Sequence, residues 1–533
     1  MPLEQPAPDV WSLLADWAGH APNAPAFLHD GHAITFADLH ETSLRVAQGL
    51  SDLGIGPGDR VALWLPNLPA YPILYFACVR LGAIAAAVNT RFRAVEVADI
   101  VGRSGAKVLV CAPGFRHIDF LSILADIEPA ALDGLTAIVT VAEAPEPVPD
   151  SISRLRRLPF DRLSSRPLLG VNHARASAPC NIFTTSGTTS APKFVLHRQG
   201  AIAGHAQQVA RAFGFSAEGT LSLLLMPLCG VFGFNQAMTT LAAGKPSVLV
   251  ESVDIAATVE LIERHRPTTL FGSDDMFARL LEAAPGPSPF PSVQWAGYGA
   301  FNASLEDIAE RAAERGLVLR GLYGMSELQA FFAAQPLQAP LARRSKGGGL
   351  PTSPIAHARV RDPDSGELLG PGQPGMLECA GPSLMVGYWG NEQATAAAMT
   401  SDGYLRTGDL GELDGHGGFT FLSRMGDVLR LSGFLVNPLE IETHLQKYRG
   451  IEACQTIAVA RPEGVRPVAF VILRPGASLD EAGLIAHCRS GLANYKVPLR
   501  VFALDDFPKT PSPNGFKIQR NKLREMAEER LRA

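Results

Sequence analysis

The stretch TFADLHETSLRVAQGLSDLG, residues Thr35 to Gly54, decides the fold class of this chain. Its apolar residues recur at helical spacing and a glycine ends the pattern, so it predicts an amphipathic helix. The segment DRVALWLPN, residues 59–67, follows shortly after it and is short and mostly apolar. That composition is typical of a buried strand. A helix that leads into a buried strand is the repeating unit of an α/β protein.

The same unit recurs in AVEVADIVGRSGAKVLVCA (94–112) and in AATVELIERHRPTTLFGS (256–273). From about Val360 the pattern changes to short strands separated by turns such as DPDSG and DGHGG, which indicates a smaller β-rich unit. We therefore predict an α/β fold with a large N-terminal domain, residues 1–425. It comprises α/β subdomains and a small β-barrel-like unit at about 350–425. A small α+β domain is expected over residues 426–533.

Composition excludes several classes of protein. The chain has 533 residues, of which 47% are hydrophobic and 19% charged, so a large core is expected and disorder is not. Its net charge is -5, and it carries no basic run that would indicate a nucleic-acid partner. The seven cysteines are scattered without a C-x-x-C pair. They indicate reduced thiols in a cytoplasmic protein.

The apolar segments are too short to span a membrane. LGAIAAAVN (81–89) and LSLLLMPLCGVFGF (221–234) are interrupted or brief, and the N-terminus has no basic start followed by a long apolar core. We therefore expect no membrane span and no signal peptide.

TTSGTTSAPKFVLH, residues Thr184 to His197, gathers hydroxyl side chains, a glycine and a lysine. Neutral donors combined with a cation suit a polyphosphate. The stretch is not a P-loop of the G-x-x-x-x-G-K-[ST] type, because Phe194 stands where that motif has Ser or Thr. A Ser/Thr-rich surface loop is the alternative.

Five further stretches share this polar, glycine-rich character: GYGAF (297–301), YGMSE (323–327), GYLRTGD (403–409), SRMGDVLRLSGFLVNPLEIE (423–442) and SPNGFKIQRNKLR (512–524). With these motifs in this order, the chain resembles the adenylate-forming superfamily, in its acyl-CoA synthetase branch. The resemblance spans nearly the whole sequence. It implies that the domain of residues 426–533 is mobile.

The resemblance assigns the opening hydroxyl-rich stretch to the β- and γ-phosphates of ATP. The residues concerned are Thr185, Ser186, Gly187, Thr188 and Thr189, with Lys193 as a supporting cation. Thr188 is also expected at Mg²⁺. The family usually has glycine where Ser190 and Phe194 stand, so both side chains are expected to restrict the loop.

In YGMSE the resemblance places Tyr323 and Gly324 at adenine, Ser326 near the α-phosphate and Glu327 on Mg²⁺. One carboxylate with phosphate oxygens is a usual set of ligands for that ion. A strand-to-helix turn with a capping serine is the alternative. Gly299 and Ala300 of GYGAF are expected to form a wall beside adenine and the acyl group.

Two charged residues would hold the ribose, and one would act in catalysis. Asp409 is expected to accept hydrogen bonds from the ribose hydroxyls, and Arg424 to assist there. Lys517 is expected to bridge the substrate carboxylate and the α-phosphate, where both reactants are anions. A solvated basic tail is the alternative for Lys517.

The implied reaction forms an acyl-adenylate from ATP and a small-molecule carboxylic acid, and then a thioester with coenzyme A. The family swings its C-terminal domain between these steps, and the hinge position is here Gly426, where glycine allows large φ/ψ changes. Gly433 is expected to line the channel for the pantetheine arm of coenzyme A.

The acyl pocket is expected to include residues of MPLCGVFGFNQAM (226–238) and of the adenine-binding motifs. The expected residues are Gly230, Phe232, Phe234, Tyr298 and Met325. Gly230 stands where this branch usually has His or an aromatic residue, so the pocket favours an apolar or aromatic acid. Asp274 and Asp275 are expected to begin a helix. The alternative is that one of them meets a polar group of the substrate.

Two other functions stay open at this point. One is an acyl-AMP ligase that loads an acyl carrier protein, and the other is a non-catalytic homologue that only binds adenylate. The sequence also leaves open whether the protein is a homodimer.

Overall fold

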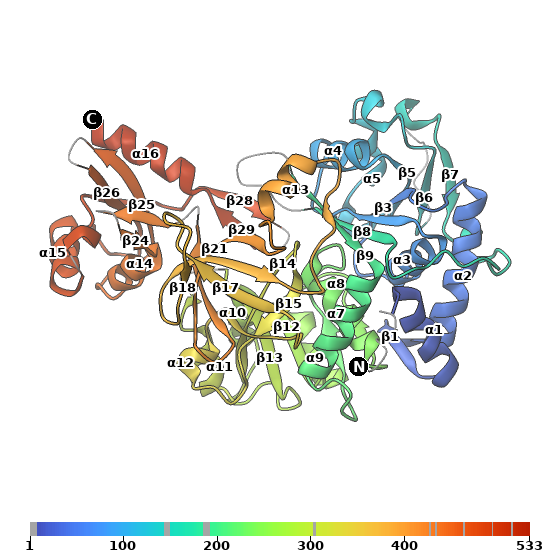
Figure 1. Cartoon of the computed structure of the whole chain (residues 1–533), viewed down its shortest axis with the longest axis horizontal. Coiled ribbons are helices and arrows are strands. Elements are labelled where there is room, and N and C mark those ends of the chain that lie inside the picture. Colours follow the sequence, from blue (N-terminus) through green and yellow to red (C-terminus); the bar gives the residue numbers. More distant parts are fainter. Residues whose placement is uncertain are drawn as a thin grey trace.

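The computed structural model describes residues 8–142, 150–184, 192–301, 305–425, 428–431, 434–461, 464–492, 494–512 and 515–532. In this part of the chain two large sheets dominate (Figure 1). The first has the order β18 (Leu368–Leu369), β17 (His357–Arg361), β19 (Gly375–Ala380), β21 (Leu405–Leu413), β22 (Phe419–Arg424), β16 (Gly348–Pro351), β15 (Gln329–Ala334), β14 (Leu319–Met325), β13 (Trp295–Gly299), β12 (Thr269–Ser273), β10 (Ser222–Leu224), β11 (Ser247–Leu249), β1 (Pro25–His29) and β2 (His32–Thr35).

The second sheet is parallel over most of its width. Its order is β20 (Gly387–Tyr388), β9 (Phe194–Arg198), β8 (Pro179–Thr184), β4 (Ile84–Ala87), β3 (Arg60–Trp64), β5 (Ala106–Cys111), β6 (Ala137–Thr140) and β7 (Arg156–Pro159). Within the described residues of this sheet, β9 pairs antiparallel with both β8 and β20, and the other pairs are parallel. The two sheets confirm the predicted α/β class.

The helix predicted from the opening stretch is α2 (Phe36–Asp52). Thr35 caps it, because its hydroxyl accepts the Asp38 N–H while the Asp38 carboxylate accepts the Thr35 N–H. The other predicted helix–strand units are also present, as α4 (Ala94–Ser104) before β5 and α9 (Ile255–His265) before β12.

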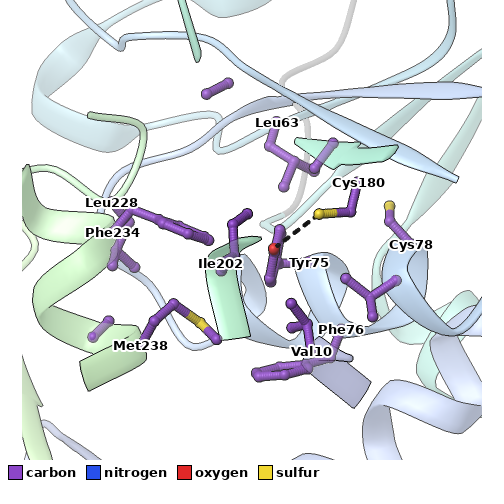
Figure 2. Close-up of a cluster of buried hydrophobic side chains, with 14 of the residues drawn as sticks. Val10, Leu63, Tyr75, Phe76, Cys78, Cys180, Ile202, Leu228, Phe234 and Met238 are labelled. Carbon is purple, nitrogen blue, oxygen red and sulfur yellow. Dashed lines mark hydrogen bonds between the residues drawn. The ribbon is translucent and has the colours of Figure 1, made fainter. Parts of the chain in front are cut away.

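The main core lies between the two sheets. One buried cluster joins residues of both sheets to the helices α1 (Val10–His20), α2, α3 (Ala70–Leu81), α7 (Gln199–Ala212) and α8 (Val231–Ala242). Figure 2 shows Phe234 of α8 among Leu228, Ile202 and Met238. It also shows the Tyr75 hydroxyl beside the Cys180 sulfur, 3.7 Å away. The remaining helices of this part are α5 (Phe120–Ala125), α6 (Asp161–Ser164), α10 (Asp274–Ala283), α11 (Ile308–Glu314), α12 (Leu341–Arg344) and α13 (Glu392–Ala398).

The β-rich unit predicted at about 350–425 differs from the expected shape. In the described residues its strands do not close into a barrel. They extend the first sheet, because β16 pairs with β15 on one side and with β22 on the other. This continuity brings β21 and β22 into the sheet that also contains β14.

The C-terminal part forms a separate unit at one end of the long axis (Figure 1). Its elements are β23 (Leu429–Leu431), β24 (Phe434–Val436), α14 (Pro438–Gln446), β25 (Ile451–Arg461), β26 (Gly464–Leu473), α15 (Glu481–Gly491), β27 (Val501–Ala503), β28 (Lys509–Ser512), β29 (Gly515–Ile518) and α16 (Arg520–Arg532). Hydrogen bonds link it to the larger part. The Thr443 hydroxyl donates to Glu306 at 2.7 Å, and the Asn437 amide donates to the Leu422 carbonyl at 3.0 Å.

All seven cysteines are free and buried in the structure. Burial raises the pKa of Cys78, Cys111, Cys180 and Cys229 to about 12. Within the described ranges, no helix has both the length and the apolar character needed to cross a bilayer.

Asn67 connects the two sheets through the segment that follows β10. Its amide donates to the Leu224 and Met226 carbonyls, each at 3.1 Å, and its side-chain oxygen accepts the Leu228 N–H at 2.8 Å. The side chain is buried, so Asn67→Ala leaves three buried backbone groups unpaired. We expect a loss of about 2–4 kcal/mol in the free energy of unfolding, measured by urea denaturation.

Asn172→Ala is the matched control, because the exposed Asn172 side chain accepts one local hydrogen bond from Ala174. It should change the urea midpoint little. Equal effects of the two substitutions would contradict the role given to Asn67.

Candidate active site

The candidate site lies where three parallel strands of the first sheet end. β12, β13 and β14 are paired in parallel, so the ends of β12 at Ser273, of β13 at Gly299 and of β14 at Met325 meet at one edge. Ligands in open α/β sheets bind at such carboxyl edges. The residues expected around adenine and the acyl group therefore belong to neighbouring strand ends.

Asp409 is a buried carboxylate held from two sides. It lies on β21 opposite Arg424 of β22, and Arg424 Nη1 is 2.8 Å from Asp409 Oδ1. The Tyr323 hydroxyl at the end of β14 donates to Asp409 Oδ2 at 2.6 Å. The Tyr323 ring packs edge-on against Phe419. Three residues that the sequence assigned to the nucleoside thus form one connected group.

Burial is the largest influence on Asp409, and it raises the pKa of this carboxyl above its ordinary value. The Arg424 guanidinium and the Tyr323 hydroxyl oppose that rise, while the nearby Glu327 adds to it. Asp409 is only 2% exposed. Two specific neighbours therefore favour the charged form of Asp409 against the effect of burial.

Glu327 is held by the second sheet. The Tyr388 hydroxyl on β20 donates to Glu327 Oε1 at 2.9 Å, and the Met385 N–H donates to the Glu327 carbonyl at 2.8 Å. Glu327 is buried. Among the described residues, no basic side chain forms an ion pair with its carboxylate, and Oε2 has no hydrogen-bond partner. A carboxylate oxygen without a hydrogen-bond partner suits a hard cation.

Ser326 is fixed through its backbone. The Nε2 atom of His197, on β9, lies 2.7 Å from the Ser326 carbonyl, so the imidazole tautomer with its proton on Nε2 can donate to it. Burial lowers the pKa of His197 to about 4. The ring therefore stays neutral near pH 7 and acts as a donor that ties β9 to the YGMSE turn.

The glycine of YGMSE is required by close packing. A Cβ at Gly324 would lie 2.6 Å from the Gln329 carbonyl oxygen and 2.7 Å from Ala330 Cα, closer than side chains approach backbone. Gln329 has a φ of 66°, in the left-handed region. Its amide is held by hydrogen bonds to Ala201, Ser383 and Asn235. Such strain is tolerated where surrounding contacts over-determine the backbone.

The described ends of the hydroxyl-rich stretch lie together, because Thr184 of β8 pairs with Phe194 of β9. Phe194 was expected to restrict the loop, but it is a strand residue and only 1% exposed. Arg103 of α4 lies over the Phe194 ring at 4.3 Å and donates to the Pro192 carbonyl at 3.0 Å. Phe194 therefore anchors the start of β9 in the core.

The residues expected around the acyl group have different environments. Gly230 begins α8, and a Cβ there would meet only the Pro227 carbonyl, at 3.5 Å, so there is room for a ligand or side chain. Phe232 packs against Phe331, and Phe234 against Tyr75 and Phe183. Tyr298 is also buried, and its hydroxyl donates to the Ser345 carbonyl at 2.6 Å. Met325, at the end of β14, is partly buried.

Asp274 and Asp275 begin α10, with Ser273 as its N-cap, which confirms the helix-start prediction. The Asp274 carboxylate is buried and accepts the Phe301 N–H at 2.7 Å. It thereby fixes the segment after Gly299. Asp275 is exposed.

Several predicted site residues lie outside the described residues. They are Thr185, Ser186, Gly187, Thr188, Thr189, Gly426, Gly433 and the side chain of Lys517. The Lys517 backbone is in β29, opposite Thr510. Sequence analysis missed His197 and Tyr388, although His197 ends the quoted hydroxyl-rich stretch.

Replacement of Arg424 by Met should change the pH dependence of nucleotide binding. Arg424 lowers the pKa of Asp409, so its loss moves protonation of Asp409 to higher pH. A protonated carboxyl accepts ribose hydroxyls less well. As the pH is lowered, we therefore expect AMP binding, measured calorimetrically, to begin to weaken at a higher pH in Arg424→Met than in the wild type. Arg406→Met, on β21 like Asp409, is the control, and identical pH profiles in all three proteins would contradict this role of Arg424.

Comparisons with known proteins agree with this geometry. The family model described as AMP-binding enzyme matches residues 14–389, and the one described as AMP-binding enzyme C-terminal domain matches residues 440–513. Feruloyl-CoA synthase from an Amycolatopsis species is 30% identical, over 93% of this chain and 95% of that protein. Long-chain-fatty-acid–CoA ligase from Escherichia coli is 28% identical, over 98% and 95%.

Among solved structures, ATP-bound MatB from Rhodopseudomonas palustris superposes with a TM-score of 0.83 at 27% identity, over 97% of this chain and 98% of that one. The first family match alone covers well over half of the sequence. Together with the ordered motifs and the buried carboxylates of Asp409 and Glu327, these matches lead to one conclusion: the chain belongs to the AMP-binding enzyme family, in the acyl-CoA synthetase branch of the adenylate-forming superfamily.

Proposed function

We propose that this protein is an AMP-forming acyl-CoA ligase. A carboxylate oxygen attacks the α-phosphorus of ATP, the bond to pyrophosphate breaks, and an acyl-adenylate remains. The thiol of coenzyme A then attacks the acyl carbonyl and AMP leaves. The observation that carries this proposal is the pair of buried carboxylates Asp409, on β21, and Glu327, just after β14, each of which accepts a hydrogen bond from a tyrosine hydroxyl.

Asp409 and Tyr323 would hold the nucleoside. In this proposal the Asp409 carboxylate accepts the ribose hydroxyls, with Arg424 beside it, and the Tyr323 ring lies against adenine. Gly299 is half-buried and Ala300 is exposed at the end of β13. These small residues would lie beside adenine. Gly324 lets the backbone turn beside the same ligand.

Glu327 fits a magnesium ion. Its carboxylate is a hard oxygen donor, it is buried, and the described residues provide it with no ionic partner. When bound, the ion would neutralise charge on the ATP phosphates. Thr188 is proposed as a further ligand, and Ser326 is placed beside Glu327 to donate its hydroxyl to the α-phosphate.

The hydroxyl-rich stretch and two lysines would bind the remaining negative charge of the phosphates and of the carboxylate substrate. Thr185, Ser186, Gly187 and Thr189 are proposed at the β- and γ-phosphates, with Lys193 at the base of the loop. Lys517 would lie between the two anionic reactants, where a preorganised cation stabilises the transition state.

The second step would follow a rotation of the C-terminal domain. Gly426 is proposed as the hinge and Gly433 as part of the channel for pantetheine. Asn437 and Thr443 contact the larger part through hydrogen bonds. Polar contacts of this kind between domains permit relative motion.

The acyl substrate is proposed to be an apolar or aromatic carboxylic acid. Gly230, the N-cap of α8, has room for a Cβ, and Phe232 and Phe234 make its surroundings apolar. The segment 226–238 contains no acidic residue that could pair with an α-ammonium group. A relative that is 30% identical is a feruloyl-CoA synthase, which supports an aromatic acid as the first substrate to test.

The test is acid-dependent exchange of labelled pyrophosphate into ATP, followed by CoA-dependent formation of AMP. We expect hydroxycinnamic and fatty acids to support exchange and α-amino acids to fail, because nothing in the segment 226–238 pairs with an ammonium group. Exchange supported only by amino acids would contradict the proposal. A phosphopantetheinylated carrier protein, supplied in place of coenzyme A, tests the alternative acceptor.

Two variants control this assay. Lys517→Ala should reduce exchange by about 10²-fold or more, because one stabilising cation is lost. Lys522→Ala removes an exposed lysine from the same tail and should leave exchange unchanged. A protein that exchanges no pyrophosphate with any acid, but still binds AMP, would instead be a non-catalytic homologue.

A further inference from the structure

Tyr388 reaches Glu327 from a distant part of the chain. It lies on β20, which pairs antiparallel with β9 so that Tyr388 is opposite Val195. The Tyr388 N–H donates to the Thr395 hydroxyl at 2.8 Å, which fixes the strand against α13. The residue is 8% exposed. Its ring is therefore held in place independently of Glu327.

The hydroxyl of Tyr388 contacts one oxygen of the Glu327 carboxylate and does not contact the other. It donates to Oε1 at 2.9 Å, while Oε2 has no hydrogen-bond partner in the described part of the chain. A carboxylate held by one oxygen cannot rotate freely about its terminal bond.

Tyr388 also contacts a second residue that the family resemblance assigns to ATP. The Lys193 ammonium lies 4.7 Å from the centroid of the Tyr388 ring, a distance at which a cation is attracted to an aromatic face. One side chain thus links the proposed metal ligand to the proposed phosphate-binding lysine.

We propose that Tyr388 is a positioning residue that orients the Glu327 carboxylate for magnesium–nucleotide. The inference rests on the proposed function, in which Glu327 binds the ion. Hydrogen-bond partners of metal-binding carboxylates orient the ligand, and their loss typically weakens metal binding by about 10–100-fold. Tyr388 acts through Glu327 and contacts neither the metal nor the acyl group in this proposal.

The test is Tyr388→Phe, which keeps the ring and removes the hydroxyl. The main-chain hydrogen bond from Met385 to Glu327 remains, so the fold should be retained. Binding of a non-hydrolysable ATP analogue is measured by calorimetry over a series of Mg²⁺ concentrations. We expect Tyr388→Phe to need about tenfold more Mg²⁺ for half-maximal binding, while its affinity for AMP without Mg²⁺ stays the same.

Tyr448→Phe is the matched control. Its hydroxyl donates to the Asp480 carboxylate at 2.6 Å in the C-terminal unit, so the same type of hydrogen bond is lost elsewhere. This variant should bind the analogue with the wild-type dependence on Mg²⁺. All titrations are run at a temperature at which near-ultraviolet circular dichroism shows every variant folded.

Glu327→Gln separates the two levels of the proposal. If Glu327→Gln loses the dependence on Mg²⁺ and Tyr388→Phe behaves like the wild type, the positioning role is overturned and the role of Glu327 stands. If Glu327→Gln itself behaves like the wild type, the metal role of Glu327 fails. In the double variant, Tyr388→Phe should have no further effect. A full additional loss there would show that Tyr388 acts through the fold and would overturn the inference.

Discussion

The arrangement of this molecule depends on providing hydrogen-bond partners for two buried carboxylates, Asp409 and Glu327. Removing a charged carboxylate from water is costly unless hydrogen bonds or an opposite charge replace the lost solvation. Asp409 accepts a hydrogen bond from Tyr323 and forms an ion pair with Arg424, and Glu327 accepts a hydrogen bond from Tyr388. Each partner comes from a different strand. The relative positions of these strands are therefore fixed at the point where the proposed nucleotide would bind.

The two sheets serve this purpose in different ways. The first sheet carries Tyr323, Asp409 and Arg424, because β14, β21 and β22 belong to one continuous sheet. The second sheet supplies His197 and Tyr388 from β9 and β20, which contact the turn after β14. Helices α1, α2, α3, α7 and α8 pack with residues of both sheets in one buried cluster. The site at the junction thus gains rigidity from both cores.

Local structure and motif residues could be predicted from the sequence, whereas the contacts between sheets could not. The capping box at Thr35 and the apolar periodicity of α2 are local signals, and the structure has the helix there. Tyr388 has no such signal, because it reaches Glu327 only through the pairing of β20 with β9. The family motif usually has glycine at the position of Phe194, which predicts a loop residue. In the structure Phe194 is a buried strand residue. The predicted barrel-like shape of the β-rich unit differs from the structure for a similar reason. The turns after Val360 do not reveal that β16 pairs with both β15 and β22 and so joins two sets of strands into one sheet.

The most direct test of the central claim is Asp409→Asn, measured by thermal unfolding and by AMP binding. The amide keeps the shape of the side chain and removes a charge whose burial raises the pKa of the carboxyl. We expect the midpoint of unfolding to be equal or higher, because an uncharged group costs less to bury. We also expect AMP affinity to fall by about tenfold or more, since hydrogen bonds to a charged acceptor are lost. Unchanged AMP affinity in Asp409→Asn would contradict the claim that this buried carboxylate is kept for the nucleotide.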